Sequence, residues 1–259
     1  MSEPRAKKSL GQHWLRDAST LAAMCDAADL TADDTVLEIG PGLGTLTELL
    51  VKRAHEVIAV EFDERLAREL GDRLAANNLQ IVSQDILSFD LTSLPPHYKV
   101  AANIPYYLTS NLIRLLSETP NPPQTIALLV QKEVAERVAA GPGAMSLLSV
   151  TAQFYWQVRL GQVVPAELFE PPPRVDSRIL SMTRRPEPLF EVDTKKFFRL
   201  VKAGFAQRRK TLLNSLGGGL QLSRQETQKL LDAAGLEPSR RAQTLSLAEW
   251  HRLYRAWNT

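Results

Sequence analysis

The residues best suited to chemistry are Asn103, Ile104, Pro105 and Tyr106, which directly follow a short apolar run. Such a segment can be an ordinary strand-to-helix turn in which the Asn bonds its own backbone. It can also be a pocket for a flat substrate that carries an exocyclic amine, whose delocalised lone pair is poorly nucleophilic. The residue types alone leave both interpretations open.

The pocket interpretation gives each of the four residues a separate task. The Asn103 side-chain oxygen accepts one N–H of the amine, and the Ile104 carbonyl accepts the other. Pro105 favours an extended Ile104, which presents that carbonyl, and Tyr106 offers a face on which a base can stack. This chemistry depends on orientation and charge placement, without a nucleophilic residue.

A second group of candidate residues follows three apolar runs nearer the N-terminus. Gly40 and Gly42 belong to a Glu-x-Gly-x-Gly-x-Gly loop between a predicted strand and a predicted helix, where the backbone can approach a ligand closely. Glu61 ends the next strand, where a carboxylate can accept hydrogen bonds from both hydroxyls of a ribose. Asp85 follows the third strand and could accept from an adenine amino group. Together they predict a nucleoside pocket, although the glycines alone could form a tight structural turn.

The glycine spacing distinguishes between two kinds of nucleoside cofactor. A dinucleotide enzyme would normally show Gly-x-Gly-x-x-Gly, with its pyrophosphate at the helix N-terminus. The loop in this chain instead resembles the first motif of S-adenosylmethionine methyltransferases, whose cofactor has no phosphate. A nicotinamide dehydrogenase is therefore disfavoured, also because no proton-transfer group lies near residue 103 in the sequence.

The elements that must position these residues have the pattern of an α/β fold. Apolar runs alternate with helical Leu spacing, which predicts a mostly parallel sheet in a Rossmann-like domain over residues 1–187. The predicted strands are 35–39, 56–61, 79–83, 98–103 and 125–130. Two further β-rich segments, 157–164 and 174–184, are joined too closely for a helical crossover and predict an antiparallel edge.

The last part of the chain has a different periodicity and charge. From residue 188 the pattern is purely helical, which predicts a small all-helical C-terminal domain over 188–259, with the glycines at 217–219 breaking the chain and Ser223 capping the next helix. Residues 187–259 have 13 Lys and Arg against 7 Asp and Glu, whereas residues 1–186 have 18 against 22. This asymmetry favours an anionic partner such as nucleic acid.

Three adjacent cations, Arg208, Arg209 and Lys210, are candidate RNA contacts on a predicted helix. On one helix they cannot all face the same way, so we expect only some of them to meet phosphate. A solvated helix end is the alternative.

Composition excludes several other classes of protein. No stretch approaches the roughly 20 apolar residues of a membrane span, and the N-terminus lacks the apolar core of a secretory signal. Cys25 is the only cysteine and the four His are scattered, so we predict no disulfide, no metal site and no Cys-His dyad. We expect Cys25 to be a buried apolar residue and the protein to be cytoplasmic.

The chain resembles the ribosomal RNA adenine N(6)-dimethyltransferases over nearly its whole length. Asn-Ile-Pro-Tyr is similar to their N-[LI]-P-[YF] motif, and residues 8–15 and 165–177 are similar to their G-Q-N-F-L and F-x-P-P-P-x-V-D-S motifs. Residues 204–216 and 241–250 resemble C-terminal motifs of the KsgA-type branch. In that branch the activity is transfer of four methyl groups to two adjacent adenines near the 3′ end of small-subunit rRNA, within a pre-ribosomal particle.

The resemblance also implies roles for individual residues. It implies S-adenosylmethionine contacts from the glycine loop and from Gln12, His13, Leu15, Gly40, Gly42, Glu61, Asp85 and Asn103. It implies target-adenine contacts from Asn103, Ile104, Tyr106 and Phe169, with a core aromatic residue as the alternative for Phe169. We expect Tyr107 to pack, and the protein to act as a monomer.

Two departures from the family pattern and two alternative functions stay open. His13 stands where Asn is usual, and residues 141–150 lack the Tyr-Gly that often precedes the family's Leu-Ser-Val. An Erm-type enzyme acting on large-subunit rRNA shares the Asn-Ile-Pro-Tyr motif, but its C-terminal helices are expected to differ. A non-catalytic rRNA-binding assembly factor would not need an intact Asn103–Tyr106 segment or a complete cofactor pocket.

Overall fold

The computed structural model describes residues 12–258. The described chain forms two compact units. The first comprises the residues up to Ala135 together with Gln157–Arg184, and the second comprises Glu136–Trp156 together with the residues from Arg185 onward. The division into one domain over residues 1–187 and another over 188–259 stays a prediction.

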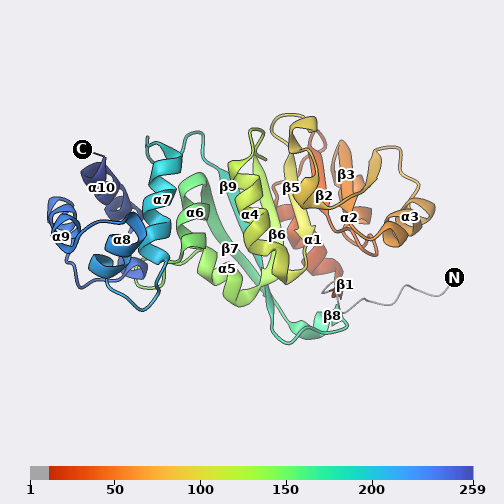
Figure 1. Ribbon diagram of the computed structural model, residues 1–259. Coiled ribbons are helices and arrows are strands. Elements are labelled where there is room, and N and C mark those ends of the chain that lie inside the picture. Colours follow the sequence, from red (N-terminus) through yellow and green to blue (C-terminus); the bar gives the residue numbers. More distant parts are fainter. Residues whose placement is uncertain (1–11, 259) are drawn as a thin grey trace. The chain divides into compact units, whose positions relative to one another are not determined.

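The first unit is built on a seven-stranded sheet in the order β4-β3-β2-β5-β6-β9-β7 (Figure 1). The neighbouring pairs from β4 to β6 are parallel, and β9 runs antiparallel to β6. The predicted sheet with an antiparallel edge is therefore confirmed. The strands are β2 (Thr35–Ile39), β3 (Glu56–Glu61), β4 (Leu79–Ser83), β5 (Lys99–Asn103), β6 (Thr125–Gln131), β7 (Trp156–Val164) and β9 (Ser177–Arg184).

Helices cover both faces of this sheet, because its central strands are apolar on both sides. α1 and α2 pack on the face that carries Val36, Ala101 and Leu129, and α4 lies on the opposite face in Figure 1. The sequence interpretation missed α1, which Asp17 caps by accepting from the Thr20 N–H at 2.8 Å. The helices are α1 (Ala18–Ala27), α2 (Thr47–Arg53), α3 (Glu64–Arg73), α4 (Thr109–Glu118) and α5 (Lys132–Val138), which runs into the second unit.

A two-stranded sheet joins two segments that are far apart in the sequence. β1 (Trp14–Leu15) pairs antiparallel with β8 (Phe169–Glu170), so that Leu15 lies opposite Phe169. Both side chains are buried in the core beneath α1 and α2. This pairing holds the N-terminal segment against the first unit, which the sequence pattern did not predict.

The second unit is helical within the described range. Its helices are α6 (Leu147–Tyr155), α7 (Thr194–Phe205), α8 (Leu212–Leu220), α9 (Arg224–Ala233) and α10 (Leu247–Trp257). The predicted cap at Ser223 is confirmed at the start of α9, where Ser223 forms a capping box with Glu226. None of the helices in residues 12–258 has the length and apolar character needed to cross a membrane.

The prediction that three glycines break the chain at 217–219 is wrong. They lie inside α8, which ends at Gln221 in the left-handed conformation. A Cβ on Gly219 would lie 2.6 Å from the Ala203 Cβ of α7. Gly219 therefore permits a close approach of α8 to α7, which outweighs its poor helix propensity.

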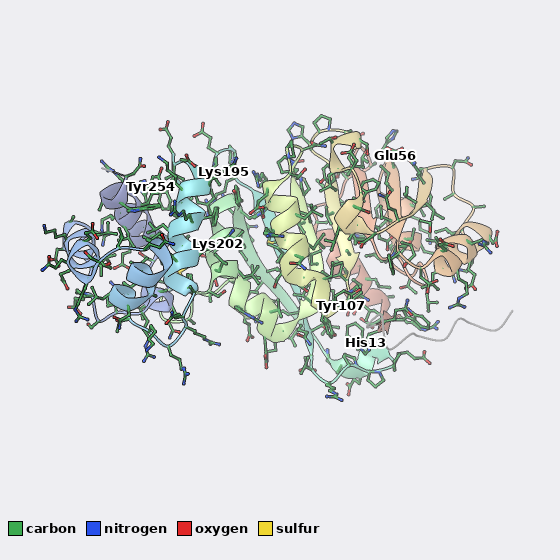
Figure 2. The ribbon with its side chains drawn as sticks, in the orientation of Figure 1. His13, Glu56, Tyr107, Lys195, Lys202 and Tyr254 are labelled. Carbon is green, nitrogen blue, oxygen red and sulfur yellow. The ribbon has the colours of Figure 1, made fainter. Side chains whose placement is uncertain are left out.

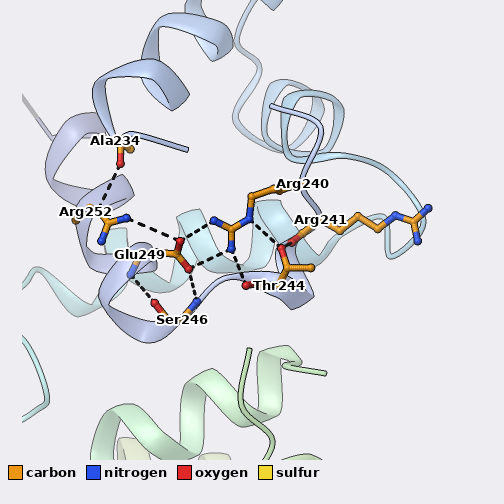
Figure 3. Close-up of polar contacts among 7 residues, drawn as sticks. All are labelled: Ala234, Arg240, Arg241, Thr244, Ser246, Glu249 and Arg252. Carbon is orange, nitrogen blue, oxygen red and sulfur yellow. Dashed lines mark hydrogen bonds and ion pairs between the residues drawn. The ribbon is translucent and has the colours of Figure 1, made fainter. Parts of the chain in front are cut away.

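An ion pair fixes the start of α10 in the second unit (Figure 3). The Arg240 guanidinium donates to both oxygens of Glu249, at 2.6 and 3.2 Å, and Glu249 also accepts from the Ser246 N–H at 2.8 Å. The hydrogen bonds from Arg240, reinforced by the Ser246 N–H, hold the pKa of Glu249 at about 2.

Candidate active site

One cavity in the first unit gathers most of the predicted site residues. It lies at the carboxyl ends of β2, β3 and β5, which meet at one edge of the sheet because these strands are parallel. The predicted residues that line it are Gln12, His13, Leu15, Gly40, Gly42, Glu61, Asp85, Asn103, Ile104, Pro105 and Tyr106.

The glycine loop is shaped for close approach of a ligand. Gly40 and Gly42 have φ angles of 66° and 55°, which other residue types rarely adopt. A Cβ on Gly42 would meet the Trp14 indole at 3.4 Å. The Gly42 N–H donates to Glu61 Oε2 at 3.0 Å, so the loop and the end of β3 support each other.

Glu61 is held in one orientation at the cavity wall. Its other oxygen accepts from the Asp63 N–H at 2.9 Å, and the residue is 6% exposed. Burial raises the pKa of Glu61, and the backbone N–H groups of Asp63 and Gly42 oppose that shift. A carboxylate fixed in this way is suited to accept hydrogen bonds from vicinal hydroxyls.

A second buried carboxyl group, Glu38, lies in the same cavity wall and was given no role from the sequence. It is 1% exposed, and its Oε2 has no hydrogen-bond partner among the described residues. Burial, with the nearby Glu61 charge adding to it, raises the pKa of Glu38 to about 8. Its place in the Glu-x-Gly-x-Gly-x-Gly motif was the signal that could have identified it.

The cavity mouth has an apolar surface that the sequence interpretation also missed. Asp85 is exposed there and accepts from the Leu87 N–H at 2.9 Å. Phe62 is 61% exposed and Leu87 is 45% exposed, and both line the cavity. An exposed aromatic ring next to fixed carboxylates suits a purine, and the position of Phe62 directly after Glu61 at the end of β3 was the signal available in the sequence.

The Asn103–Tyr106 segment forms the wall on the side of β5. Asn103 ends that strand, and its side-chain N–H donates to the His13 carbonyl at 3.2 Å. The amide oxygen of Asn103 has no hydrogen-bond partner among the described residues. It is therefore available to a substrate. Pro105, with φ −56° and ψ 135°, turns the chain into a short 3₁₀ helix that begins at Tyr106.

His13 packs against the ring of Tyr106. The two ring centroids are 5.9 Å apart with planes 20° from parallel, and His13 Nδ1 lies 2.7 Å from the Pro171 carbonyl oxygen. Because a carbonyl only accepts, Nδ1 carries the proton. Tyr106 is anchored at its far end, where its hydroxyl is 2.8 Å from the Ser177 hydroxyl. The imidazole that replaces the usual Asn thus supports the aromatic wall.

Two other aromatic residues lie differently from the expectations. Tyr107 is 68% exposed at the cavity mouth, so the expectation that it packs is wrong. Figure 2 shows Tyr107 and His13 near the same end of the sheet. Phe169 is 4% exposed, faces Leu15 in the two-stranded sheet and is not among the residues that line the cavity. Its assignment as a base contact stays a prediction.

The basic triplet lies in the second unit. Arg208, Arg209 and Lys210 are exposed in the turn between α7 and α8. The expectation that they share a helix is wrong, because α7 ends at Phe205 and α8 begins at Leu212. Because the three residues lie in a turn, helix geometry does not force their side chains to point in different directions.

Comparison with known families identifies the family of the chain. A family model described as "Ribosomal RNA adenine dimethylase" matches residues 4–258. The chain belongs to the ribosomal RNA adenine dimethylase family. This membership confirms the predicted methyltransferase activity on rRNA adenine and the predicted cofactor, S-adenosylmethionine.

The curated relatives agree with this family. The chain is 45% identical over 254 residues to "Ribosomal RNA small subunit methyltransferase A" of Dehalococcoides mccartyi, covering 96% of this chain and 87% of the relative. It is 42% identical over 261 residues to the protein of the same name from Streptococcus equi subsp. zooepidemicus, covering 95% and 90%.

Solved structures confirm the fold. A dimethyladenosine transferase from Plasmodium falciparum superimposes with a TM-score of 0.82 at 26% identity, covering 95% of this chain and 98% of that chain. The 23S rRNA methyltransferase ErmE superimposes with a TM-score of 0.76 at 30% identity, covering 95% and 100%. This chain thus shares its fold with both enzymes.

Proposed function

We propose that this chain transfers four methyl groups from S-adenosylmethionine to the N(6) amines of two adjacent adenines near the 3′ end of small-subunit rRNA. The observation that carries the proposal is the cavity itself, where a nucleoside pocket and the Asn103–Tyr106 wall share one space. The identity of 45% and 42% to relatives named as small-subunit methyltransferases, against 30% to ErmE, favours the small subunit as substrate.

The residues of the pocket fit S-adenosylmethionine. Glu61 would hold the ribose hydroxyls, Asp85 the adenine amino group, and the glycine loop would leave room for the chain that bears the sulfonium. The buried Glu38 oxygen without a partner provides an acceptor in the cavity wall for a cationic ligand. S-adenosylmethionine supplies an electrophilic methyl group in this reaction.

The opposite wall would prepare the adenine amine. The Asn103 amide oxygen and the Ile104 carbonyl each accept one N–H, which draws the nitrogen toward a tetrahedral geometry with its lone pair directed at the methyl group. Neither acceptor takes up a proton at neutral pH, so the proton that the methylated nitrogen loses passes to water. Placing two fixed acceptors where positive charge develops lowers the barrier without a strong base.

Tyr106 would hold the base by stacking. Its ring is fixed by His13 on one side and by Ser177 at the hydroxyl, so little conformational entropy is lost when a base binds. Phe169 would contribute a second aromatic contact only after a local change, because its side chain is buried.

We further propose that the enzyme acts in the cytoplasm, as a monomer, on a pre-ribosomal particle. A reducing compartment agrees with Cys25 as the single cysteine of the sequence. Burial raises the pKa of that thiol to about 11, which makes it unreactive at neutral pH.

The test is incubation of the protein with labelled S-adenosylmethionine and small subunits that lack the modification. We expect N(6),N(6)-dimethyladenosine at two adjacent positions near the 3′ end of the rRNA. Label found only in free large-subunit rRNA would favour an Erm-type enzyme. Cofactor binding without label in either RNA would favour a non-catalytic assembly factor.

A further inference from the structure

The longest stretch of unbalanced charge in the chain lies in the second unit. From Thr194 to Gln225 the sequence has eight Lys and Arg residues and no Asp or Glu. The remainder of the chain has 23 Lys and Arg against 29 Asp and Glu. Only three of the eight cations belong to the triplet Arg208–Lys210, so the stretch contains charge that the family motifs do not explain.

Four of the other cations form the exposed side of α7. Its buried side is apolar and includes Phe197, Leu200 and Val201. Its exposed side carries Lys195, Lys196, Arg199 and Lys202, which we call the α7 basic face. Figure 2 shows Lys195 and Lys202 on this helix.

The spacing of these cations concentrates their charge. Lys195, Arg199 and Lys202 lie within about 60° of one another around the helix axis and span about 10 Å along it. Like charges at such spacings destabilise an isolated helix by about 0.2–0.5 kcal/mol per pair. None of the four cations forms an ion pair with another residue in the range 12–258, so the repulsion is not relieved within the described chain.

The α7 basic face lies beside an aromatic ring, and α7 itself has no acidic residue. The Arg199 guanidinium lies 5.7 Å from the centre of the Trp257 ring, and Lys196 Nζ donates to the neutral Asn258 side chain at 3.3 Å. The nearest acidic residue in sequence, Asp193, accepts from the Lys196 N–H as the helix cap. Cations beside an aromatic ring, with no acidic residue on the helix, are typical of surfaces that bind a nucleic-acid backbone.

We propose that the α7 basic face binds the sugar-phosphate backbone of small-subunit rRNA outside the target adenines. The inference rests on the proposed function, because it takes the same RNA as partner. RNA is favoured over an acidic protein surface because the cations form a stripe of the kind that follows a phosphate chain, and because the Arg199–Trp257 pair offers stacking. Such a contact does not depend on the base sequence. It strengthens RNA binding and aligns the RNA with the catalytic pocket.

The test compares two triple variants that each remove three positive charges from the second unit. One combines Lys195→Gln, Arg199→Gln and Lys202→Gln. The matched control combines Arg224→Gln, Lys229→Gln and Arg241→Gln, whose side chains are also exposed but lie outside α7. Figure 3 shows Arg241 pointing away from the Arg240–Glu249 ion pair. Binding of each protein to protein-free small-subunit rRNA is measured over a series of KCl concentrations.

We expect the α7 variant to bind roughly 10- to 100-fold more weakly at low salt. Three lost phosphate contacts should lower the slope of log K against log [KCl] by about 2, while the control variant stays within about 3-fold of the wild type. A charge-keeping variant, Lys195→Arg with Lys202→Arg, should retain the slope of the wild type. Loss of slope in that variant, or equal weakening by both neutral triples, would overturn the proposal.

Two further outcomes separate this inference from the proposed function. In the first, the wild type methylates small-subunit rRNA while the α7 variant binds the RNA as tightly as the wild type does. In that case the proposed role of the α7 basic face is wrong and the proposed function stands. If the α7 variant is weakened on intact subunits but not on protein-free rRNA, its partner is a ribosomal protein, and the RNA assignment fails. A wild type that neither binds nor methylates the RNA contradicts the proposed function instead.

Discussion

At the residue scale, the site combines fixed acceptors with one buried acid, Glu38, whose Oε2 has no hydrogen-bond partner among the described residues. The Asn103 amide and the Glu61 carboxylate are each oriented by a backbone group, the His13 carbonyl in the first case and the Gly42 and Asp63 N–H groups in the second. Glu38 is buried without such support for its Oε2. A group of this kind is stable in a folded protein mainly when it is protonated.

Glu38 should therefore make the stability of the unliganded protein depend on pH. Its pKa is about 8 when folded and about 4.3 in an unfolded chain, so the folded state binds the extra proton between these values. The free energy of unfolding should fall as pH rises from about 4.5 to 8. Glu38→Gln, which imitates the protonated form, should remove much of this fall in denaturant unfolding followed at pH 5 and pH 8.

The matched control for this experiment is Glu118→Gln, an exposed acid at the end of α4. It should keep the pH dependence of the wild type. A Glu38→Gln protein whose stability falls between pH 5 and pH 8 as steeply as that of the wild type would show that Glu38 is ionised throughout.

At the element scale, the parallel strands were the most predictable part of the chain. β2, β3 and β4 have the residues expected from their apolar runs. β2 and β3 are buried on both faces, and such strands leave continuous apolar patterns in the sequence. β1 and β8 were missed because a two-residue strand has no periodicity and depends on a partner about 155 residues away. The glycines of α8 were misinterpreted because their helical state depends on the approach of α7, which no local pattern records.

The glycines of α8 give a direct test of that close packing. Gly219→Ala should lower the free energy of unfolding by about 1–3 kcal/mol, because the new methyl group overlaps Ala203 of α7. Gly218→Ala should raise it by about 0.5–1 kcal/mol, because a Cβ there meets nothing within 4 Å and Ala favours the helix. Thermal or denaturant unfolding of the two variants checks the opposite signs; a loss of stability in both would contradict the proposed packing.

The start of α10 should depend on the Arg240–Glu249 ion pair. Glu249→Gln should lower the free energy of unfolding by about 1–3 kcal/mol at pH 7, because it removes a charge-assisted pair. The pKa of Glu249 is lowered to about 2, so its stabilisation is present above about pH 4.5 and is lost as pH falls toward 2. Unfolding curves of the two proteins should converge in that window, and a constant difference down to pH 2 would assign the effect to packing.

At the scale of the whole molecule, the sequence predicted where chemistry would occur better than how the site is assembled. Eleven of the predicted residues line one cavity. Eight of them lie at or just after the carboxyl ends of parallel strands, which topology brings together, whereas Gln12, His13 and Leu15 come from the segment at β1, which pairs with β8. The support of Tyr106 by His13 and Ser177 could not be predicted, because it joins segments about 90 and 71 residues apart. The exposed Phe62 and Tyr107 were also missed, since a short apolar or aromatic stretch does not reveal which side chain faces water.

The central claim is that Asn103 acts on the target amine, and its most direct test is to measure turnover and cofactor affinity separately in Asn103→Ala. The control is Asn111→Ala, an exposed amide on α4, which should match the wild type in both measurements. With small subunits as substrate, we predict that Asn103→Ala lowers kcat by about 100-fold or more, as expected for loss of a fixed acceptor at a developing charge. The Kd for S-adenosylmethionine should change by less than about 3-fold, a difference below about 1 kcal/mol. A loss of cofactor affinity as large as the loss of turnover would contradict the role of Asn103 at the amine.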